Sequence, residues 1–333
     1  MSSIYDRDLE RVEANHQPLT PLTFLERAAR VFPQTTAVIY GDLRIDYADF
    51  YRRCRQLASA LADRGIARSD TVSVMLANTP AMLEAHYAVP MCGAVLHAMN
   101  TRLDAAVIAL QLDHAQSRVL ITDTAFSATI GQALEITSAE PLIIDYIDPV
   151  EPQTGDRLGD HEYEATLASG DADFAWAMPQ DEWDAIAVNY TSGTTGDPKG
   201  VVYHHRGACL LAQGNIITAS IPKHAVYLWT LPMFHCNGWC FPWTIAAVNG
   251  THVCLREVRG DAIWAALADH RVTHLCGAPV VMSTLLAASQ QQQRRLTTTV
   301  EFFTAAAPPP ESVLSEMREA GFNVTHLLSL IHI

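Results

Sequence analysis

Hydrophobic and polar residues alternate along the chain in short blocks, which predicts strands separated by amphipathic helices. Apolar side chains between Tyr47 and Asp63 recur every three or four positions with arginines between them, which predicts a helix that stops at Gly65. Just before this helix, two short apolar runs flank Gly41-Asp42, a pattern typical of a β-hairpin. Strand-like and helix-like blocks then alternate to the end of the chain, and this order favours a largely parallel sheet covered by helices.

The same alternation places the remaining elements. Strands are expected at residues 36–40, 43–47, 71–76, 94–99, 118–122, 142–145, 185–190, 226–231, 252–255, 273–276, 300–304 and 323–327. Besides the helix at 47–63, helices are expected at residues 80–91, 104–114, 206–217, 261–270, 280–288 and 311–320. A chain of 333 residues with this order is predicted to form one large α/β unit or two α/β subdomains.

One stretch interrupts the alternation and divides the chain. Residues 146–182 are rich in Asp, Glu, Gly and Pro and only weakly periodic, although aromatic residues such as Tyr163 and Phe174 can anchor them to a core. We therefore expect a first α/β subdomain at 19–145, an acidic connecting segment, and a second α/β subdomain at 183–327.

Composition excludes several classes of function. With 36 acidic against 22 basic side chains the net charge is −14, so bulk attraction to nucleic acid or anionic lipid is excluded. No apolar run reaches the roughly 18 residues that a membrane-spanning helix needs, so we expect no membrane span. The polar N-terminus lacks a signal-peptide pattern, which leads us to expect a cytoplasmic location with reduced, unpaired cysteines.

Two cysteines raise the question of a metal site, because Cys236 and Cys240 lie close to His235. No second Cys or His pair stands at zinc spacing, so we expect these cysteines to pack as small apolar side chains. We expect no metal site built from protein ligands.

The segment richest in chemistry is YTSGTTGDPKG at residues 190–200, directly after an expected strand. Its glycines permit backbone N–H groups to approach an anion closely, its hydroxyls are donors, and its lysine adds a mobile positive charge. It is not a Walker A loop, because Lys199 stands three residues after Gly196 and precedes Gly200. The residues expected to wrap a polyphosphate are Thr191, Ser192, Gly193, Thr194, Thr195, Gly196 and Lys199.

This segment resembles the phosphate-binding signature of the adenylate-forming superfamily, which includes acyl-CoA synthetases, peptide-synthetase adenylation domains and luciferases. Residues 231–238 (LPMFHCNG) resemble the second motif of the family, and residues 305–310 (AAAPPP) resemble its adenine-binding turn. Arg256 stands where the family often has a basic residue. The resemblance runs from about Leu19 to Leu327 and covers only the first part of a typical member.

A subgroup of the superfamily shows the strongest resemblance. It contains medium-chain acyl-CoA synthetases, 3-methylmercaptopropionyl-CoA ligases and plant-type acyl-activating enzymes. The segments that carry this finer resemblance are VVYHHRGA at 201–208, FHCNGWCFPW at 234–243, EAHYAVP at 84–90 and NTRL at 100–103.

The resemblance implies a fold, a reaction and its co-substrates. The fold is the large N-terminal domain of these enzymes, with two stacked and mostly parallel-sheet subdomains. In the reaction, the carboxylate of a fatty acid or another small-molecule carboxylic acid attacks the α-phosphate of ATP, giving acyl-AMP and pyrophosphate, and the thiol of coenzyme A then displaces AMP. Mg²⁺ is expected to arrive with ATP. A homodimer is left open.

The resemblance also implies roles for single residues. Lys199 and the loop before it would hold the β- and γ-phosphates. His235 would position the carboxylate or gate the acyl tunnel, against the alternative of a core histidine. Trp239, one helical turn later, would wall the acyl site or else pack in the core. Two further groups are expected, with Gly277 and Ala278 at the acyl pocket and with Ala306, Ala307 and Pro308 at the adenine.

The sequence departs from the family pattern after Leu327. The hydrophobic tail at 328–333 replaces the expected Tyr-Gly-x-Thr-Glu motif, and the family's small C-terminal domain with its lysine does not follow. We expect a C-terminally truncated or frame-shifted reading whose first large domain is incomplete and which has no ligase activity by itself. Two alternatives stay open, namely an adenylation module that serves a carrier protein and an inactive nucleotide-binding remnant.

Overall fold

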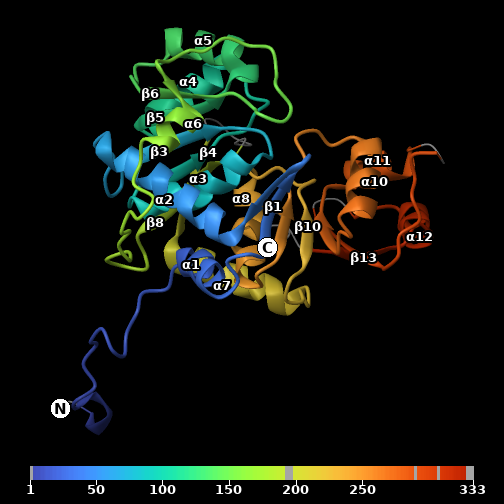
Figure 1. Ribbon diagram of the computed structural model, residues 1–333, viewed down its shortest axis with the longest axis horizontal. Coiled ribbons are helices and arrows are strands. Elements are labelled where there is room, and N and C mark those ends of the chain that lie inside the picture. Colours follow the sequence, from blue (N-terminus) through green and yellow to red (C-terminus); the bar gives the residue numbers. More distant parts are fainter. Residues whose placement is uncertain (1–2, 192–197, 289–290, 306–307, 328–333) are drawn as a thin grey trace.

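The computed structural model describes residues 3–191, 198–288, 291–305 and 308–327, and they form two seven-stranded sheets with helices around them (Figure 1). Sheet A has the strand order β14-β13-β12-β10-β11-β1-β2, and sheet B has the order β7-β6-β5-β3-β4-β8-β9. Neighbouring strands are parallel except in two hairpins, β1–β2 and β8–β9. The expected α/β architecture of two mostly parallel sheets is therefore confirmed.

The strands are short, and all except β7 and β9 lie close to their expected positions. Sheet A contains β1 (Thr36–Tyr40), β2 (Leu43–Asp46), β10 (Val226–Leu228), β11 (Thr251–Val253), β12 (His274–Cys276), β13 (Val300–Thr304) and β14 (Phe322–His326). Sheet B contains β3 (Thr71–Met75), β4 (Val95–Ala98), β5 (Ser117–Asp123), β6 (Leu142–Tyr146), β7 (His161–Glu162), β8 (Ala185–Tyr190) and β9 (Gly200–His204).

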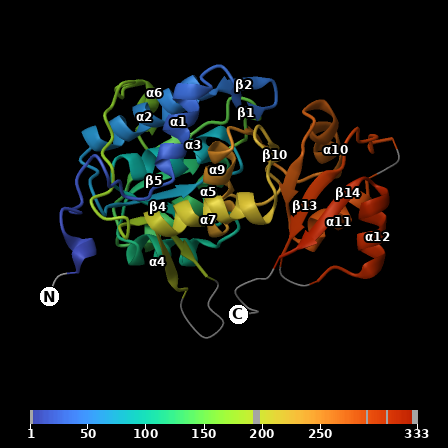
Figure 2. The ribbon, with the colours of Figure 1, turned by 90° about the horizontal axis from the view of Figure 1, so that it is seen from below.

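The helices cover the faces of both sheets. They are α1 (Leu22–Val31), α2 (Tyr47–Asp63), α3 (Pro80–Met91), α4 (Ala105–His114), α5 (Ser127–Ile136), α6 (Tyr163–Ala168), α7 (His205–Thr218), α8 (Cys236–Trp239), α9 (Phe241–Ala247), α10 (Gly260–Asp269), α11 (Pro279–Leu286) and α12 (Glu311–Glu319), with 3₁₀ turns at Ile4–Asp6 and Thr124–Phe126. Viewed from below, α7 runs across the front of the molecule, with α10 to α12 at one end (Figure 2). No helix in the described ranges is long and apolar enough to cross a membrane.

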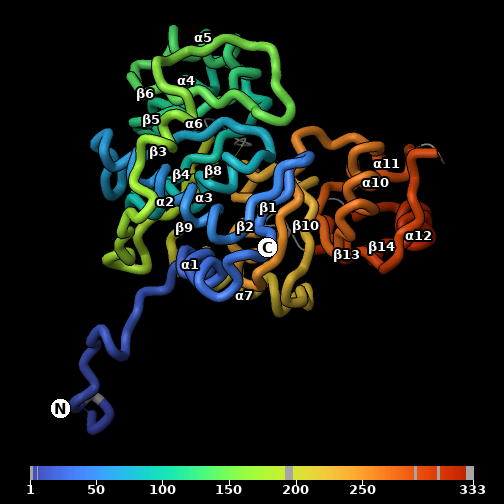
Figure 3. The backbone as a smooth tube through the Cα atoms, in the orientation of Figure 1, coloured from blue at the N-terminus to red at the C-terminus, as the bar shows by residue number. Residues whose placement is uncertain are grey.

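Each sheet contains strands from both of the subdomains that the sequence predicts. The hairpin β1–β2 lies in the first segment, 19–145, yet β1 pairs with β11 in sheet A. The hairpin β8–β9 lies in the second segment, 183–327, yet β8 pairs with β4 in sheet B. Figure 3 shows the blue β1 beside the yellow-to-orange strands of sheet A. Each sheet is therefore completed by a hairpin from the other half of the chain.

Helix α2 shows how closely local pattern and structure agree. It spans the predicted residues, and the Asp46 carboxylate accepts a hydrogen bond from the Asp49 amide at 2.8 Å, which caps the helix N-terminus. After the helix, Gly65 adopts a φ of +81°, a left-handed conformation that favours glycine. Helices α1, α5, α6 and α9 were not predicted.

Helix α3 is central to the fold, since all twelve of its residues are buried. Burial includes Glu84, which therefore needs partners. The Arg53 guanidinium lies 2.5 Å from Glu84 Oε1, and the Tyr163 hydroxyl donates to Glu84 Oε2 at 2.6 Å. Tyr163 belongs to the acidic connecting segment, so this buried carboxylate ties that segment to the core.

A second buried ion cluster joins the two sheets. Arg256 follows β11 in sheet A, and its Nη1 atom lies 2.7 Å from both Asp123 Oδ2 and Asp148 Oδ2. Asp123 ends β5 and Asp148 follows β6, both in sheet B. Tyr40, at the end of β1, donates its hydroxyl to Asp148 at 2.6 Å. Because all these groups are buried, removal of one partner would leave an uncompensated charge in the seam, the buried contact between sheets A and B.

Buried histidines make the fold sensitive to acid. Burial lowers the pKa of His86 and His97 to about 4 and that of His252 to about 3. Unfolded histidines take up protons near pH 6.5, so between pH 6.5 and 4 the unfolded state holds more protons than the folded state. We predict that the free energy of unfolding falls across this window, by up to roughly 3 kcal/mol for each such histidine. Guanidinium unfolding at a series of pH values measures this slope.

The variant His86→Gln provides the control for this prediction. The ring Nδ1 of His86 donates to the Met82 carbonyl at 2.7 Å, and a glutamine can also donate a hydrogen bond but cannot titrate. We expect the slope to fall by about one proton per molecule. An unfolding free energy that stays constant from pH 7 to pH 5 in the unaltered chain would contradict the prediction.

Candidate functional site

The candidate site residues follow the carboxyl ends of parallel strands. The loop at 191–199 follows β8, and the segment at 229–240 follows β10. Residues 277–278 follow β12, and residues 305–308 follow β13. In open α/β sheets, ligands bind outside the carboxyl ends of the strands, so each sequence motif follows a strand end of the kind at which this topology favours a site.

Hydrogen bonds between the segments bring the edges of the two sheets together. Near the end of β8 in sheet B, the Asn189 side-chain amide donates to the Phe234 carbonyl at 3.2 Å. In sheet A, the Thr230 hydroxyl donates to the Cys276 carbonyl at 2.8 Å. The segment that carries His235 therefore contacts both the loop-bearing strand of sheet B and the end of β12.

The phosphate-binding candidate is a hairpin loop. Strands β8 and β9 pair in antiparallel fashion up to Tyr190 and Gly200, and the Thr191 amide extends the pairing by donating to the Lys199 carbonyl at 3.0 Å. Thr191 and Lys199 are exposed. The predicted residues Ser192, Gly193, Thr194, Thr195 and Gly196 lie outside the described residues. The two ends of the loop are thus fixed side by side, at the edge where the other motifs meet.

The side chain of Tyr190 fixes the base of this hairpin. Its hydroxyl is 2.7 Å from His114 Nδ1, and its ring packs against that of His97 with the centroids 4.9 Å apart. Burial raises the pKa of Tyr190, so the phenol stays neutral. Strand β9 itself was not expected from the sequence, because its five residues are recognisable as a strand only when paired with β8.

His235 is exposed, although partial burial lowers the pKa of its ring below the ordinary value. The imidazole is therefore neutral at pH 7, so it can donate or accept a hydrogen bond without adding charge. Its amide donates to the Pro232 carbonyl at 3.1 Å, which starts the turn that follows. The alternative of a buried core histidine does not fit this exposure.

The turn after His235 is left-handed. Residues 236–240 all have positive φ values, between +49° and +63°, and only Gly238 among them is a glycine. Such conformations cost roughly 1–3 kcal/mol for each residue in a sparsely populated region, and they cluster at functional sites. We expected Trp239 one helical turn after His235, and the structure shows that this turn is left-handed.

Contacts from neighbouring elements hold this strained turn. Asn215 in α7 donates its side-chain amide to the Trp239 carbonyl at 2.9 Å and to the Thr244 hydroxyl at 3.1 Å. Trp239 itself is half-buried against the main core. Asn237 is fully buried, and within the described part of the chain its side-chain nitrogen and oxygen have no hydrogen-bond partner.

The remaining predicted residues are those expected at the acyl pocket and at the adenine. A Cβ atom added to Gly277 would meet Val281 Cβ at 2.9 Å and Phe302 Cζ at 3.1 Å, so the absence of a side chain there serves close packing. Ala278 is exposed at the N-terminus of α11, and Pro308 is exposed after β13. Ala306 and Ala307 lie outside the described residues. The pocket and adenine roles of these residues stay predictions.

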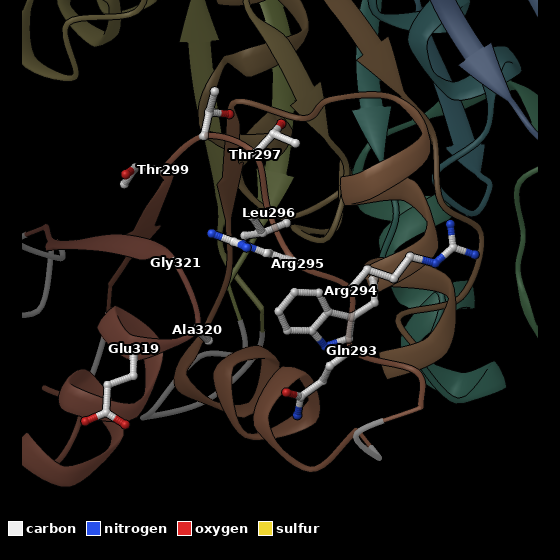
Figure 4. Close-up of a pocket in the computed structure, with 11 residues that line it drawn as sticks. Gln293, Arg294, Arg295, Leu296, Thr297, Thr299, Glu319, Ala320 and Gly321 are labelled. Atoms are coloured by element: carbon white, nitrogen blue, oxygen red, sulfur yellow. The ribbon is translucent and has the colours of Figure 1, made fainter.

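A surface pocket of about 570 Å³ lies away from this edge (Figure 4). It is lined by Trp264 of α10, residues 293–299 and residues 319–321. Glu319 and Arg294 extend to opposite sides of it, so its charged groups do not converge on one point. None of the predicted site residues lines this pocket.

Comparison with known proteins identifies the family. The model of the AMP-binding enzyme family matches residues 25–330. The chain belongs to this family. Its sequence is 46% identical to acetate/butyrate–CoA ligase, peroxisomal, of Arabidopsis thaliana over 97% of this chain. It is 44% identical to acetate–CoA ligase of Humulus lupulus over the same share. A 2-methylpropanoate–CoA ligase of Humulus lupulus is 44% identical over 84% of this chain.

The chain spans 59% of the length of the first two relatives and 51% of the third. The family match ends at residue 330, three residues beyond Leu327.

Two solved structures share the fold. The N-terminal domain of FACL13 from Mycobacterium tuberculosis superposes with a TM-score of 0.82 at 24% identity, over 94% of this chain and 76% of that one. An anthranilate CoA ligase in complex with anthranoyl-AMP superposes with a TM-score of 0.85 at 19% identity, over 97% of this chain and 62% of that one.

The left-handed turn generates a prediction with a matched control. Gly238 has a φ of +53°, and an added Cβ would lie 2.6 Å from the Trp229 ring. We predict that Gly238→Ala lowers the free energy of unfolding by about 1–3 kcal/mol, because the turn must shift. Gly214→Ala is the control, since Gly214 lies in α7 with nothing within 4 Å of the added Cβ, and a helical alanine stabilises. Equal thermal stability of the two variants would contradict the prediction.

Proposed function

We propose that the protein that carries this chain activates a short carboxylic acid with ATP and transfers the acyl group to coenzyme A. The observation that carries the proposal is the meeting of the phosphate-loop hairpin with the His235 segment, through the hydrogen bond from Asn189 to the Phe234 carbonyl. Membership of the AMP-binding enzyme family and the names of the relatives support the same reaction.

The chemistry of the two segments suits adenylation. A carboxylate is a weak electrophile, and its attack on the α-phosphate brings two anions together. The site must therefore lower negative charge at the phosphates and fix the acid without adding another anion. Lys199 and the backbone of its loop would supply the positive end. Neutral His235 would orient the carboxylate by a hydrogen bond, because it can donate one while uncharged.

Magnesium would come with ATP under this proposal. The described residues contain no group of three or more His, Cys, Asp or Glu side chains that could hold a metal ion. Mg²⁺ commonly keeps several waters and binds through substrate phosphates with only one or two carboxylates. Such a donor set does not require a preformed protein cage. Bound Mg²⁺ would neutralise phosphate charge, while residues of this chain would hold and orient the two reactants.

Short acids are the proposed substrate class. The named relatives act on acetate, butyrate and 2-methylpropanoate. The same names favour coenzyme A over a carrier protein as the acceptor.

The cellular location is also a proposal. We infer a cytoplasmic enzyme. The peroxisome is the alternative, because a relative with 46% identity is named peroxisomal. Imaging a fluorescent fusion of the protein beside a peroxisomal marker decides between them. Co-localisation with that marker would refute the cytoplasmic location.

The test of the reaction uses residues 1–333 alone and the same residues joined to the C-terminal part of acetate/butyrate–CoA ligase of Arabidopsis thaliana. We expect the joined protein to convert butyrate, ATP and coenzyme A to butyryl-CoA, AMP and pyrophosphate. We expect residues 1–333 alone to bind AMP and a non-hydrolysable butyryl-adenylate without turnover. Absence of nucleotide binding by both proteins would refute the proposal, and transfer only to a phosphopantetheinyl carrier would support the alternative.

Lysine variants sharpen this test. Lys199→Met is expected to weaken ATP binding roughly 10- to 100-fold, the range for one lost hydrogen bond to a charged group. The other lysine of the sequence, Lys223, lies over the Phe32 ring at 4.3 Å, so Lys223→Met is the matched control. We expect this control to bind ATP as the unaltered chain does. Equal loss in both variants would show that only net charge matters.

A further inference from the structure

One side chain of sheet B binds three backbone groups of the segment that leads to His235. Asn78 lies in the bend between β3 and α3 and is only 8% exposed. Its Nδ2 atom donates to the Trp229 carbonyl and to the Leu231 carbonyl, both at 3.0 Å. Its Oδ1 atom accepts a hydrogen bond from the Met233 amide at 2.9 Å.

These three partners belong to alternate residues of the chain, at positions 229, 231 and 233. Strand β10 ends at Leu228, so the backbone from Trp229 onward loses much of its strand pairing while it stays buried. Buried backbone groups need partners, and a neighbouring strand would normally supply them. Asn78 takes the place of that strand. A planar amide suits the task, because it offers two donors and an acceptor in a fixed arrangement.

Asn78 does not act alone on this segment. The Phe234 carbonyl, the next group along, accepts from Asn189 of β8 at 3.2 Å. On the other side, Thr230 is tied to the end of β12. The segment is therefore held from sheet B by two asparagines at the carboxyl ends of β3 and β8. His235 follows directly, before the left-handed turn.

We propose that Asn78 is a positioning residue that fixes His235 relative to the phosphate-loop hairpin. This inference rests on the proposed function for its catalytic meaning, because it assumes that His235 meets the acyl end of the adenylate. The Asn78 amide makes three hydrogen bonds to this backbone, so we assign it a role through the segment and not by contact with nucleotide or acid. Its loss should release the 229–235 backbone and disturb the acyl end of the site more than the nucleotide end.

The first experiment measures backbone release directly. Residues 1–333 are compared as the unaltered chain, as Asn78→Leu and as Leu112→Ala by amide hydrogen exchange. Leu112 is fully buried in α4 and belongs to a core cluster that includes none of the Asn78 partners, so its variant controls for general destabilisation. We expect the Met233 amide to exchange at least 10-fold faster in Asn78→Leu than in Leu112→Ala. Equal rates in the two variants would overturn the proposal.

The second experiment measures the consequence for binding. We expect Asn78→Leu to bind a non-hydrolysable butyryl-adenylate at least 10-fold more weakly than the unaltered chain, with AMP affinity kept within 2-fold. Asn78→Asp keeps the size and the acceptor but cannot donate to the two carbonyls, so it should show the same split if Asn78→Leu fails to fold. Equal weakening of AMP and adenylate binding would point to a purely structural role and overturn the proposal.

The two proposals fail separately in this design. If neither the unaltered chain nor the joined protein binds adenylate, the proposed function fails, while hydrogen exchange at Met233 still decides whether Asn78 holds the segment. If the unaltered chain binds adenylate and Asn78→Leu binds it equally well, the proposed function stands and the positioning role is refuted.

Discussion

The whole arrangement depends on a seam in which two sheets meet with their functional edges adjacent. Charged groups are buried in this seam, where desolvation is costly, and each has a close partner of opposite charge. Arg256 lies between Asp123 and Asp148, and these three residues come from both sheets. Apolar packing alone is non-directional and would tolerate small slips between the sheets. Paired buried charges do not tolerate such slips, so we interpret the cluster as a device that sets the register of the seam.

Local patterns predicted the parts of the fold that depend on local interactions. Helix α2 was placed at its observed bounds because its apolar spacing and its stop at Gly65 act within a few residues. The glycine-rich loop was recognised for the same reason, since its chemistry is contiguous. The division of strands between the sheets could not be predicted in this way. Whether β1 pairs with β11 or with a nearer strand depends on packing between residues about two hundred positions apart.

The candidate site shows the same division. His235 and Lys199 stand in motifs, so the sequence singled them out. Asn78 and Asn189 stand in no motif. The sequence did not single them out, because an isolated asparagine is most often a turn or surface residue. Their importance appears only when each amide is seen beside the backbone of another sheet. Gly277 was singled out for its small size, and Val281 and Phe302 lie where a side chain at this position would be, so its role at the acyl pocket stays a prediction.

The exchange of hairpins between the two sheets has a consequence for how the chain acquires its structure. Strand β1 can pair with β11 only after β11 has been synthesised. In the same way, the Tyr47 hydroxyl can donate to the Gly250 carbonyl, at 2.6 Å in the folded chain, only after residue 250 has been synthesised. During synthesis, sheet B can be completed once β9 has emerged, while the β1–β2 hairpin still has no sheet to join. Closing so long a loop late in folding is slow, and the exposed hairpin edge is open to wrong pairing meanwhile. The two sheets are thus a single folding unit, and a ribosome must deliver most of the chain before either half of the seam is secure.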